Sequence, residues 1–342
     1  MIASAYLSRV HDGPDVPEVT WIGASSFEER CVGSLRALDK MGRDVVKTVG
    51  LHYPTRVTPR DADVQKRGRN KRAIERLLKT HSAKGIEWMT VDPYVPSSLN
   101  RLFAEAEIAQ SAQPVVIDIT CLTKVHALAL AAWLARNDSP EVFLAYTLPE
   151  QYGTPAAHTR DGGRWIGVAL APMLAGAIPS GDYGNDIFSE GVNGILLLGH
   201  ERGRLALALS QCEPERALVV LARNQRHKRL KIVARAANTD LIPSRDSDTA
   251  GWRHIEIDCD LPINLRAPIE RFMEDCSKDR RRLVLYPFGP KPLILQTALT
   301  TVGLLGSLVW YCYPIPHSYD VDYTLGCSST LFFRVKRART KK

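Results

Sequence analysis

Two hydrophobic periods meet in one stretch of the chain, Val115 to Ala135. It opens with three β-branched residues at 115–117, a run typical of a strand buried on both faces of a parallel sheet. From Val125 onward the residues are almost all Ala and Leu, good helix formers that are too apolar for an exposed helix. The polar segment Asp118 to Lys124 lies between the two runs. We therefore predict a buried strand, a short polar turn and a buried helix.

The alternation of strand and helix continues on both sides of this stretch. Apolar runs predict further strands at residues 19–22, 45–52, 86–91 and 142–147, and apolar residues recur at helical spacing between these runs. Such regular alternation favours a parallel, doubly wound sheet with right-handed crossovers, whose ligand crevice lies at the carboxyl ends of the strands. We predict an α/β protein with Rossmann-like, mainly parallel sheets.

The order of elements begins again in the second half of the chain. The matching positions have nearly constant offsets: Lys291 follows Lys124 by 167 positions, Tyr313 follows Tyr146 by 167, Tyr319 follows Tyr152 by 167, and Asp258 follows Asp92 by 166. Several matches in the same order favour an internal duplication. We therefore predict two tandem Rossmann-like lobes.

The predicted lobes have approximate boundaries. The first lobe covers residues 1–160, the Gly-rich and Pro-rich segment 161–192 links the lobes, the second lobe covers 193–335, and a basic tail covers 336–342. If the lobes pack about a pseudo-two-fold axis, Lys124 and Lys291 face one shared cavity.

The turn after the central strand is a candidate anion site. A strand that gives way to a helix leaves free backbone N–H groups and the positive end of the helix dipole at the strand's carboxyl end. Thr120 and Thr123 can cap the helix or donate hydroxyls, and Lys124 adds a positive charge. Asp118 can orient either the loop or a ligand hydroxyl. In the alternative interpretation, Asp118 and Thr120 only cap a buried helix while Lys124 extends to water.

Two further loops supply candidate ligand-binding residues. Ser25 and Ser26 lie in a Gly-Ser turn after the first confident strand, where small residues let a ligand approach the backbone. In the second half, a Tyr-Pro-Phe-Gly-Pro segment replaces the Asp and Thr of the central turn, so that Gly289 and Lys291 offer only backbone groups and one charge.

Charged residues near the start of two predicted helices form a candidate rim. Residues Glu28 to Arg30 in the first half loosely match Glu201, Arg202 and Arg204 in the second half. They either line the anion pocket, with Arg for phosphate and Glu for ribose or base edges, or lie in water at a helix start. His126 is expected to pack in the core, because a position two residues beyond Lys124 turns away from it on a helix.

The string D-x-T-x-x-x-K, formed by Asp118, Thr120 and Lys124 after a buried strand, resembles the core motif of CARF domains. These are Rossmann-like sensors that bind cyclic oligonucleotides in prokaryotic antiviral defence. With its predicted duplication, the chain is also similar in plan to the fused CARF pairs of SAVED domains. The resemblance implies a sensor that holds a cyclic or linear oligonucleotide between two lobes and acts through a separate effector protein or by oligomerising.

Two other functions remain open. Some CARF domains cleave the ring that they bind, so the resemblance also allows a metal-independent ring nuclease in which Lys124 and Ser25 or Ser26 stabilise developing charge. The second alternative is a nucleic-acid-binding subunit of a defence complex. Basic segments at 66–79 and 223–235 can bind DNA or RNA as predicted helices, although such runs are often solvated faces.

Composition narrows the class of protein. The 342 residues are 45% hydrophobic and 24% charged, typical of a globular chain with room for two domains. Apolar runs are too short for a membrane span and residues 1–13 do not resemble a signal peptide, so we expect a cytoplasmic protein. A net charge of +8 suits phosphate-rich partners.

Cofactor motifs are missing from the sequence. The seven cysteines include no C-x-x-C pair, which indicates reduced thiols rather than zinc ligands or disulfides. The chain contains neither G-x-G-x-x-G nor a Walker A sequence. We therefore predict no metal and no cofactor.

Overall fold

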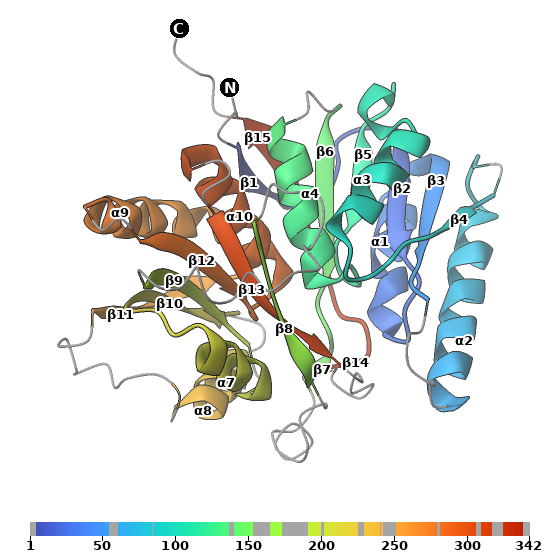
Figure 1. Cartoon of the computed structure of the whole chain (residues 1–342). Coiled ribbons are helices and arrows are strands. Elements are labelled where there is room, and N and C mark those ends of the chain that lie inside the picture. The colour runs from blue at the N-terminus through green and yellow to red at the C-terminus, as the bar shows by residue number, and fades with distance from the viewer. Residues whose placement is uncertain are drawn as a thin grey trace, which may run out of the picture. The chain divides into compact units, whose positions relative to one another are not determined.

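The computed structural model shows two compact units. It describes residues 5–54, 61–83, 85–136, 140–152, 165–172, 191–199, 202–224, 229–239, 241, 251–278, 281–305, 309–316 and 324–337. The first unit comprises Leu7–Gly153 and Val321–Arg337. The second unit comprises Met1–Tyr6, Thr154–Asp320 and Ala338–Lys342. Figure 1 shows the elements of both.

The first unit is built around a seven-stranded sheet in the order β1-β15-β6-β5-β2-β3-β4. Its strands are β1 (Ala5–Val10), β2 (Glu18–Ala24), β3 (Asp44–His52), β4 (Glu87–Thr90), β5 (Val115–Asp118), β6 (Val142–Thr147) and β15 (Thr330–Arg337). Two short strands, β7 (Gln151–Tyr152) and β14 (Thr324–Leu325), pair separately. The helices are η1 (Glu29–Val32), α1 (Gly33–Lys40), α2 (Asp61–Leu78), α3 (Pro96–Glu105), η2 (Ile108–Gln110) and α4 (Lys124–Arg136).

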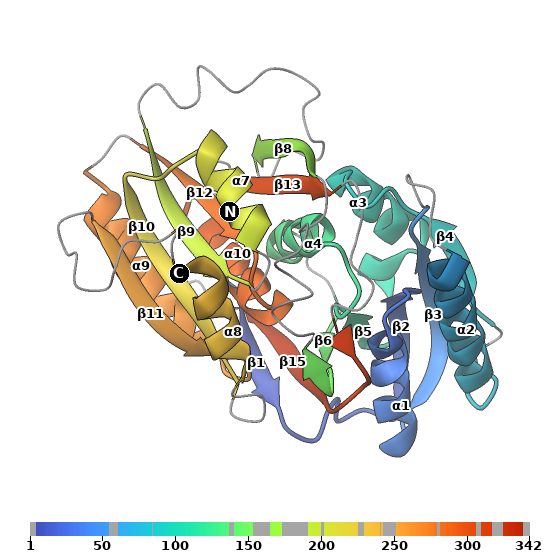
Figure 2. The same cartoon turned by 90° about the horizontal axis from the view of Figure 1, so that it is seen from below.

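Helices cover both faces of this sheet. Figure 2 shows α1 and α2 on one side and α3 and α4 on the other. On the first side, Leu35 of α1 and Ile74 of α2 are fully buried against Trp21 of β2. On the second side, the rings of Phe103 and Trp133 meet edge to face at 4.8 Å. The predicted buried helix is confirmed, since every residue from Val125 to Ala135 is buried.

The second unit has a six-stranded sheet in the order β11-β10-β9-β12-β13-β8. Its strands are β8 (Trp165–Pro172), β9 (Val192–Leu198), β10 (Arg216–Arg223), β11 (Trp252–Asp258), β12 (Arg282–Pro287) and β13 (Val309–Pro316). Its helices are α7 (Arg202–Gln211), α8 (Arg229–Asn238), η4 (Pro262–Leu265), α9 (Arg266–Cys276) and α10 (Lys291–Leu305).

The two sheets share one topology, and the predicted α/β fold class is confirmed. Strands β4-β3-β2-β5-β6 in the first unit follow the same spatial and chain order as β11-β10-β9-β12-β13 in the second. All neighbours within each set of five run parallel. An antiparallel strand then lies beside the last one in each sheet, β15 beside β6 and β8 beside β13.

The antiparallel strands change the lobe boundaries expected from the sequence. Segment 161–192, predicted as a linker, contains β8 of the second sheet. Residues 330–337, divided in the prediction between the second lobe (193–335) and the basic tail (336–342), form β15 of the first sheet. Each unit thus takes its antiparallel strand from the segment that follows the parallel strands of the other. A strand pattern shows that a segment pairs, but not with which neighbour, so chain order misled the assignment.

Equivalent turns recur at the ends of β4 and β11. Asp92 Oδ1 accepts the N–H of Tyr94 at 3.0 Å, and Asp258 Oδ1 accepts the N–H of Asp260 at 3.1 Å. Both are Asx turns, in which a side chain replaces a backbone acceptor. Their agreement with the sequence offset supports the internal duplication, which remains a prediction.

In the part of the chain that the structure describes, no helix has both the length and the hydropathy needed to cross a bilayer. All seven cysteines are free thiols, five of them buried and two half-buried.

Removal of the Phe332 ring is expected to loosen the first unit alone. Phe332 is 1% exposed in β15 and belongs to the core formed by β2, β6, α1 and α2. Phe332→Ala is expected to cost about 3–5 kcal/mol, because the ring leaves a cavity. Hydrogen exchange measured residue by residue checks this, with lost protection expected in β2, β5 and β6.

The control is Lys336→Ala, which changes an exposed residue of the same strand. An equal loss of protection in β9 and β10 of the Phe332 variant would contradict the division into units.

Candidate functional site

The carboxyl ends of three parallel strands of the first unit form the candidate site. Strand β5 lies between β2 and β6 with Ile117 in register with Ile22 and Leu144, so the loops after the three strands leave the same edge. These loops begin at Ser25, Ile119 and Leu148. The predicted site residues of the first half lie on the first two of them.

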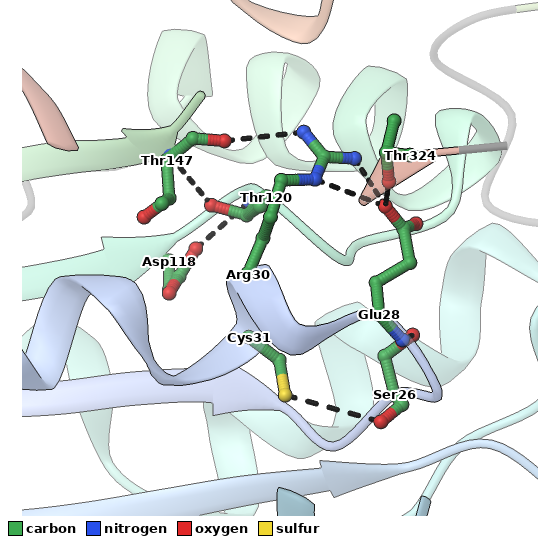
Figure 3. A network of polar contacts seen from close by, with 8 residues as sticks. All are labelled: Ser26, Glu28, Arg30, Cys31, Asp118, Thr120, Thr147 and Thr324. Atoms are coloured by element: carbon green, nitrogen blue, oxygen red, sulfur yellow. Dashed lines mark hydrogen bonds and ion pairs between the residues drawn. The ribbon is translucent and has the colours of Figure 1, made fainter. Parts of the chain in front are cut away.

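Asp118 and Thr120 are bound within the protein. Asp118 is 2% exposed, and its Oδ1 accepts the Thr120 N–H at 2.8 Å. Its Oδ2 accepts the hydroxyl of Ser34 at 2.5 Å, and that hydroxyl accepts the indole N–H of Trp21 at 3.0 Å. Thr120 is fully buried, and its Oγ1 accepts the backbone N–H of Thr147 at 2.9 Å (Figure 3). Of the two roles considered for Asp118, these contacts favour orientation of the loop.

Thr123 caps helix α4. Its Oγ1 accepts the N–H of His126 at 3.1 Å and donates to the carbonyl of Pro93 at 2.9 Å. One of the first N–H groups of the helix is therefore satisfied by a side chain. Lys124, the first residue of α4, is half-buried. Its charge therefore lies at the positive end of a 13-residue helix.

Several backbone donors at this helix start are unoccupied. Among the residues that the structure describes, the N–H groups of Cys121, Leu122 and Val125 have no hydrogen-bond acceptor. Helix N-termini with unpaired N–H groups bind anions, because the donors and the helix dipole act together. Together with Lys124 they form a concentration of positive potential at the end of β5.

The two serines of the first loop differ. Ser25 is 2% exposed, and its hydroxyl has no hydrogen-bond partner in the described part of the chain. Ser26 is half-buried, and its Oγ accepts the N–H of Glu28 at 3.2 Å. Its carbonyl accepts Nδ2 of Asn70 at 2.9 Å, which ties the loop to α2. Ser25 is therefore the serine with unused hydrogen-bonding capacity.

A buried ion pair lies beside these loops, where the sequence predicted only a charged rim. Arg30 is 4% exposed, and its Nε donates to Glu28 Oε2 at 3.0 Å. Nη2 donates to the same oxygen, and Nη1 donates to the Thr147 carbonyl at 3.1 Å (Figure 3). Burial lowers the pKa of the guanidinium, but the Glu28 carboxylate raises it, and the net shift is upward.

His126 is a core residue, as predicted. It is fully buried, with Nδ1 at 2.9 Å from the Tyr53 hydroxyl and Nε2 at 3.3 Å from the Val95 carbonyl and 3.1 Å from Ser98 Oγ. Because a carbonyl only accepts, a neutral ring that donates from Nε2 can accept the Tyr53 proton at Nδ1. Burial lowers the pKa of His126 to about 4.

The equivalent loop of the second unit offers fewer donors. Pro290 and Pro292 flank Lys291 and have no N–H group. The N–H groups of Leu293 and Ile294 are occupied by the Pro290 carbonyl. Gly289 is buried so closely that an added Cβ would lie 3.2 Å from the Leu197 Cβ. Of the predicted rim, Glu201 lies outside the described residues and Arg202 begins α7.

The two basic segments that were predicted as helices differ in the structure. Helix α2 exposes Arg69, Arg72 and Arg76, none of which has an ion-pair partner among the described residues. Its other side is tied down: Arg67 donates to the Tyr53 carbonyl at 2.8 Å. The segment 223–235 is divided, because Arg223 ends β10 and α8 begins only at Arg229.

A group of acidic and thiol side chains follows β11. Ligand atoms of Asp258, Cys259 and Asp260 lie within 4.8 Å of one another. Burial raises the pKa of Cys259 to about 12, and Asn224 donates to its sulfur at 3.2 Å. We assign no site to this group.

No protein-family model and no curated protein matches the chain. Among solved structures, it is similar to a Type III CRISPR defence DNA nuclease activated by cyclic oligoadenylate, with 11% identity and a TM-score of 0.44 over 92% of this chain and 68% of that chain. Another similar structure is an N-terminal ketoreductase from a macrolactin assembly line, with 8% identity and a TM-score of 0.23 over 90% of this chain and 74% of that chain. Both TM-scores are too low for either protein's activity to be carried over.

The buried His126 is expected to make stability depend on acid. Its pKa is about 4 in the folded protein and 6.5 without perturbation. Between these values the unfolded chain binds a proton that the folded protein excludes, so the free energy of unfolding falls as the pH falls, by roughly 3 kcal/mol in total. Urea unfolding of wild type and His126→Gln between pH 7 and 4 checks this, and the variant is expected to show a shallower decline.

The control is His11→Gln, at an exposed histidine of the same unit, which is expected to follow the wild type. Equal slopes for wild type and His126→Gln would rule out this origin of the acid sensitivity.

Proposed function

We propose that the first unit binds a phosphate group of an oligonucleotide at the N-terminus of α4. The observation that carries the proposal is the group of N–H donors on Cys121, Leu122 and Val125, which have no acceptor among the described residues, beside the charge of Lys124. Three donors and one cation at the end of a parallel strand suit an anion with several acceptor oxygens.

The residues of the motif have different roles in the proposed site. Asp118 and Thr120 hold the loop through their bonds to Ser34 and Thr147, and Thr123 fixes the first turn of the helix. The loop therefore keeps its donors in place before a ligand arrives, which lowers the entropic cost of binding. Lys124 supplies the charge, and the unpaired hydroxyl of Ser25 supplies a further donor.

The class of ligand rests on the motif itself. Asp118, Thr120 and Lys124 follow a buried strand as in the CARF core motif, and that resemblance supports a cyclic or linear oligonucleotide as the ligand. We therefore propose a sensor of such a second messenger in prokaryotic antiviral defence, with a separate effector protein as partner. That the ligand also contacts Lys291 and Gly289 of the second unit stays a prediction.

The two units are expected to contribute unequally. Proline at positions 290 and 292 removes N–H donors from the loop before α10, whereas the loop before α4 contains no proline. A phosphate is therefore expected to gain more from the first loop than from the second.

Loss of Lys124 is expected to weaken oligonucleotide binding. A charged hydrogen bond to phosphate contributes about 1.5–3 kcal/mol, which corresponds to roughly a 10- to 100-fold loss of affinity in Lys124→Ala. A panel of cyclic and linear oligonucleotides is titrated by calorimetry and by thermal shift, since a ligand that binds only the folded state raises the melting temperature. Lys291→Ala is expected to lose less affinity than Lys124→Ala.

The control is Lys40→Ala, an exposed lysine in the last turn of α1. Equal binding by wild type and Lys124→Ala would refute the proposed site. Loss of a bound ring over time, followed by chromatography of the released products, would instead favour the ring nuclease.

A second candidate function is nucleic-acid binding through α2. The observation that favours it is the exposed stripe of Arg69, Arg72 and Arg76, three cations on one helical face without ion-pair partners among the described residues. In contrast, exposed Arg101 is paired with Glu105, and Arg253 is paired with Asp275. Unpaired arginines suit the regularly spaced phosphates of a polynucleotide.

Neutralisation of the stripe is expected to lower both affinity and salt dependence. Replacement of Arg69, Arg72 and Arg76 by Gln removes three phosphate contacts, so the slope of log K against log salt for a single-stranded oligonucleotide is expected to fall by about 2. Fluorescence anisotropy at several salt concentrations measures the slope. Lys40→Ala, at an exposed lysine of α1, is the control and is expected to keep the wild-type slope. An unchanged slope in the triple variant would exclude α2 as the surface.

A further inference from the structure

Arg30 and its counter-ion Glu28 differ in their exposure to solvent. The Arg30 side chain is 5% exposed, whereas the Glu28 side chain that neutralises it is 17% exposed. Part of the Glu28 side chain is therefore in contact with solvent, whereas the Arg30 side chain is almost wholly enclosed. Removing Glu28 would open the guanidinium to whatever anion is present outside.

Arg30 has hydrogen-bonding capacity beyond its present contacts. A guanidinium has five N–H donors, and Arg30 uses three of them, two toward Glu28 Oε2 and one toward the Thr147 carbonyl. Both bonds to Glu28 converge on a single oxygen. A phosphate, with several oxygens in a fork, can engage the same donors on two oxygens at once.

Glu28 also holds a second element. The hydroxyl of Thr324 in β14 donates to Glu28 Oε2 at 2.6 Å (Figure 3). Strand β14 pairs antiparallel with β7, with Thr324 in register with Tyr152 and Leu325 in register with Gln151. One carboxylate oxygen thus joins the buried cation to the β7–β14 ribbon.

This ribbon flanks the longest chain segment of the second unit. Residues 154–320, most of that unit, leave the first unit after β7 and return just before β14. The ribbon is short, two residues on each side, and is extended by the Glu150 N–H to the Leu325 carbonyl at 3.1 Å. The Glu28–Thr324 hydrogen bond ties this ribbon to the loop after β2.

We propose that Arg30 is a phosphate-binding residue whose resident counter-ion, Glu28, is displaced when the ligand binds, and that this displacement releases Thr324 and the β7–β14 ribbon. The inference rests on the proposed function and adds a second phosphate contact and a route for the signal. The buried charge stays neutralised throughout, because one anion replaces another. The freed carboxylate is repelled by the phosphate and moves toward water.

The exchange explains how binding changes the protein. A ligand shifts a conformational equilibrium only through different interactions with the two states. Here the two states are Arg30 paired with Glu28 and Arg30 paired with phosphate, and only the first holds Thr324. The ribbon is therefore expected to be looser in the bound protein than in the free one.

The test uses the full chain, with inorganic phosphate as the probe and chloride at equal ionic strength as the reference. Glu28→Gln keeps the shape of the side chain but removes the charge that competes with phosphate, so phosphate is expected to bind at least 10-fold more tightly than to wild type. In wild type, phosphate is expected to accelerate hydrogen exchange at Glu150 and Ser328, whose N–H groups bond across this region to Leu325 and Leu148.

Thr324→Val is the second variant, because it leaves the charges in place and removes the hydrogen bond from the Thr324 hydroxyl to Glu28. This variant is expected to bind phosphate about 2- to 5-fold more tightly than wild type does. If Glu28→Gln does not fold, Thr324→Val alone tests the counter-ion exchange. Unchanged or weaker phosphate binding in the folded variants would overturn the exchange.

Lys124→Ala separates this inference from the proposed site. If Lys124→Ala abolishes phosphate binding while Glu28→Gln and Thr324→Val bind like wild type, the α4 site stands and the counter-ion exchange is wrong. If Glu28→Gln binds more tightly and Lys124→Ala has no effect, Arg30 binds phosphate without the α4 site.

Discussion

A positive charge cannot be kept away from water without a counter-ion, and this constraint governs the edge of the first sheet. The Arg30 guanidinium lies among the ends of β2, β5 and β6, where an unpaired charge would cost several kcal/mol. Glu28 is that counter-ion. The Thr147 carbonyl accepts a hydrogen bond from Arg30, and the Thr324 hydroxyl donates one to Glu28. Residues from three separate chain segments are thereby held around one cation. The loop that carries the candidate anion site is built on the same framework, since Thr120 accepts the N–H of Thr147.

Much of the fold could be predicted from the sequence, because the relevant patterns are local. β-Branched runs such as Val115 to Ile117 and the Ala-Leu helix after Val125 fix the type of element without knowledge of its neighbours. The regular alternation then selects a doubly wound sheet. The partners of β8 and β15 could not be found in this way, because the pattern of a strand does not identify the strand that it pairs with, and the choice of sheet is made by packing of the complete chain.

The candidate site was predicted in part for a similar reason. Lys124 and Thr123 could be proposed as site residues because a strand-to-helix turn is visible in the hydrophobic pattern. The roles of Asp118 and Thr120 were left open, since Ser34 and Thr147, the groups they bond, lie far away in sequence. Arg30 was expected either at the rim of the anion pocket or in water at a helix start, and its burial, which is rare for an arginine, was not predicted. No local pattern marks it as an exception, as its burial follows from a carboxylate two residues away and a return segment almost three hundred positions later.

The late return of β15 has a consequence for synthesis on the ribosome. The hydroxyls of Thr147 and Thr330 bond at 2.9 Å across 183 positions of chain. At translation rates of about 5–20 residues per second, roughly 10–40 s pass between the emergence of β6 and that of its antiparallel neighbour. During that interval the outer edge of β6 is unpaired, and unpaired strand edges are templates for association with other chains. Residues 154–320 are complete before the first unit is closed, so the part of the chain made first is the last to finish folding.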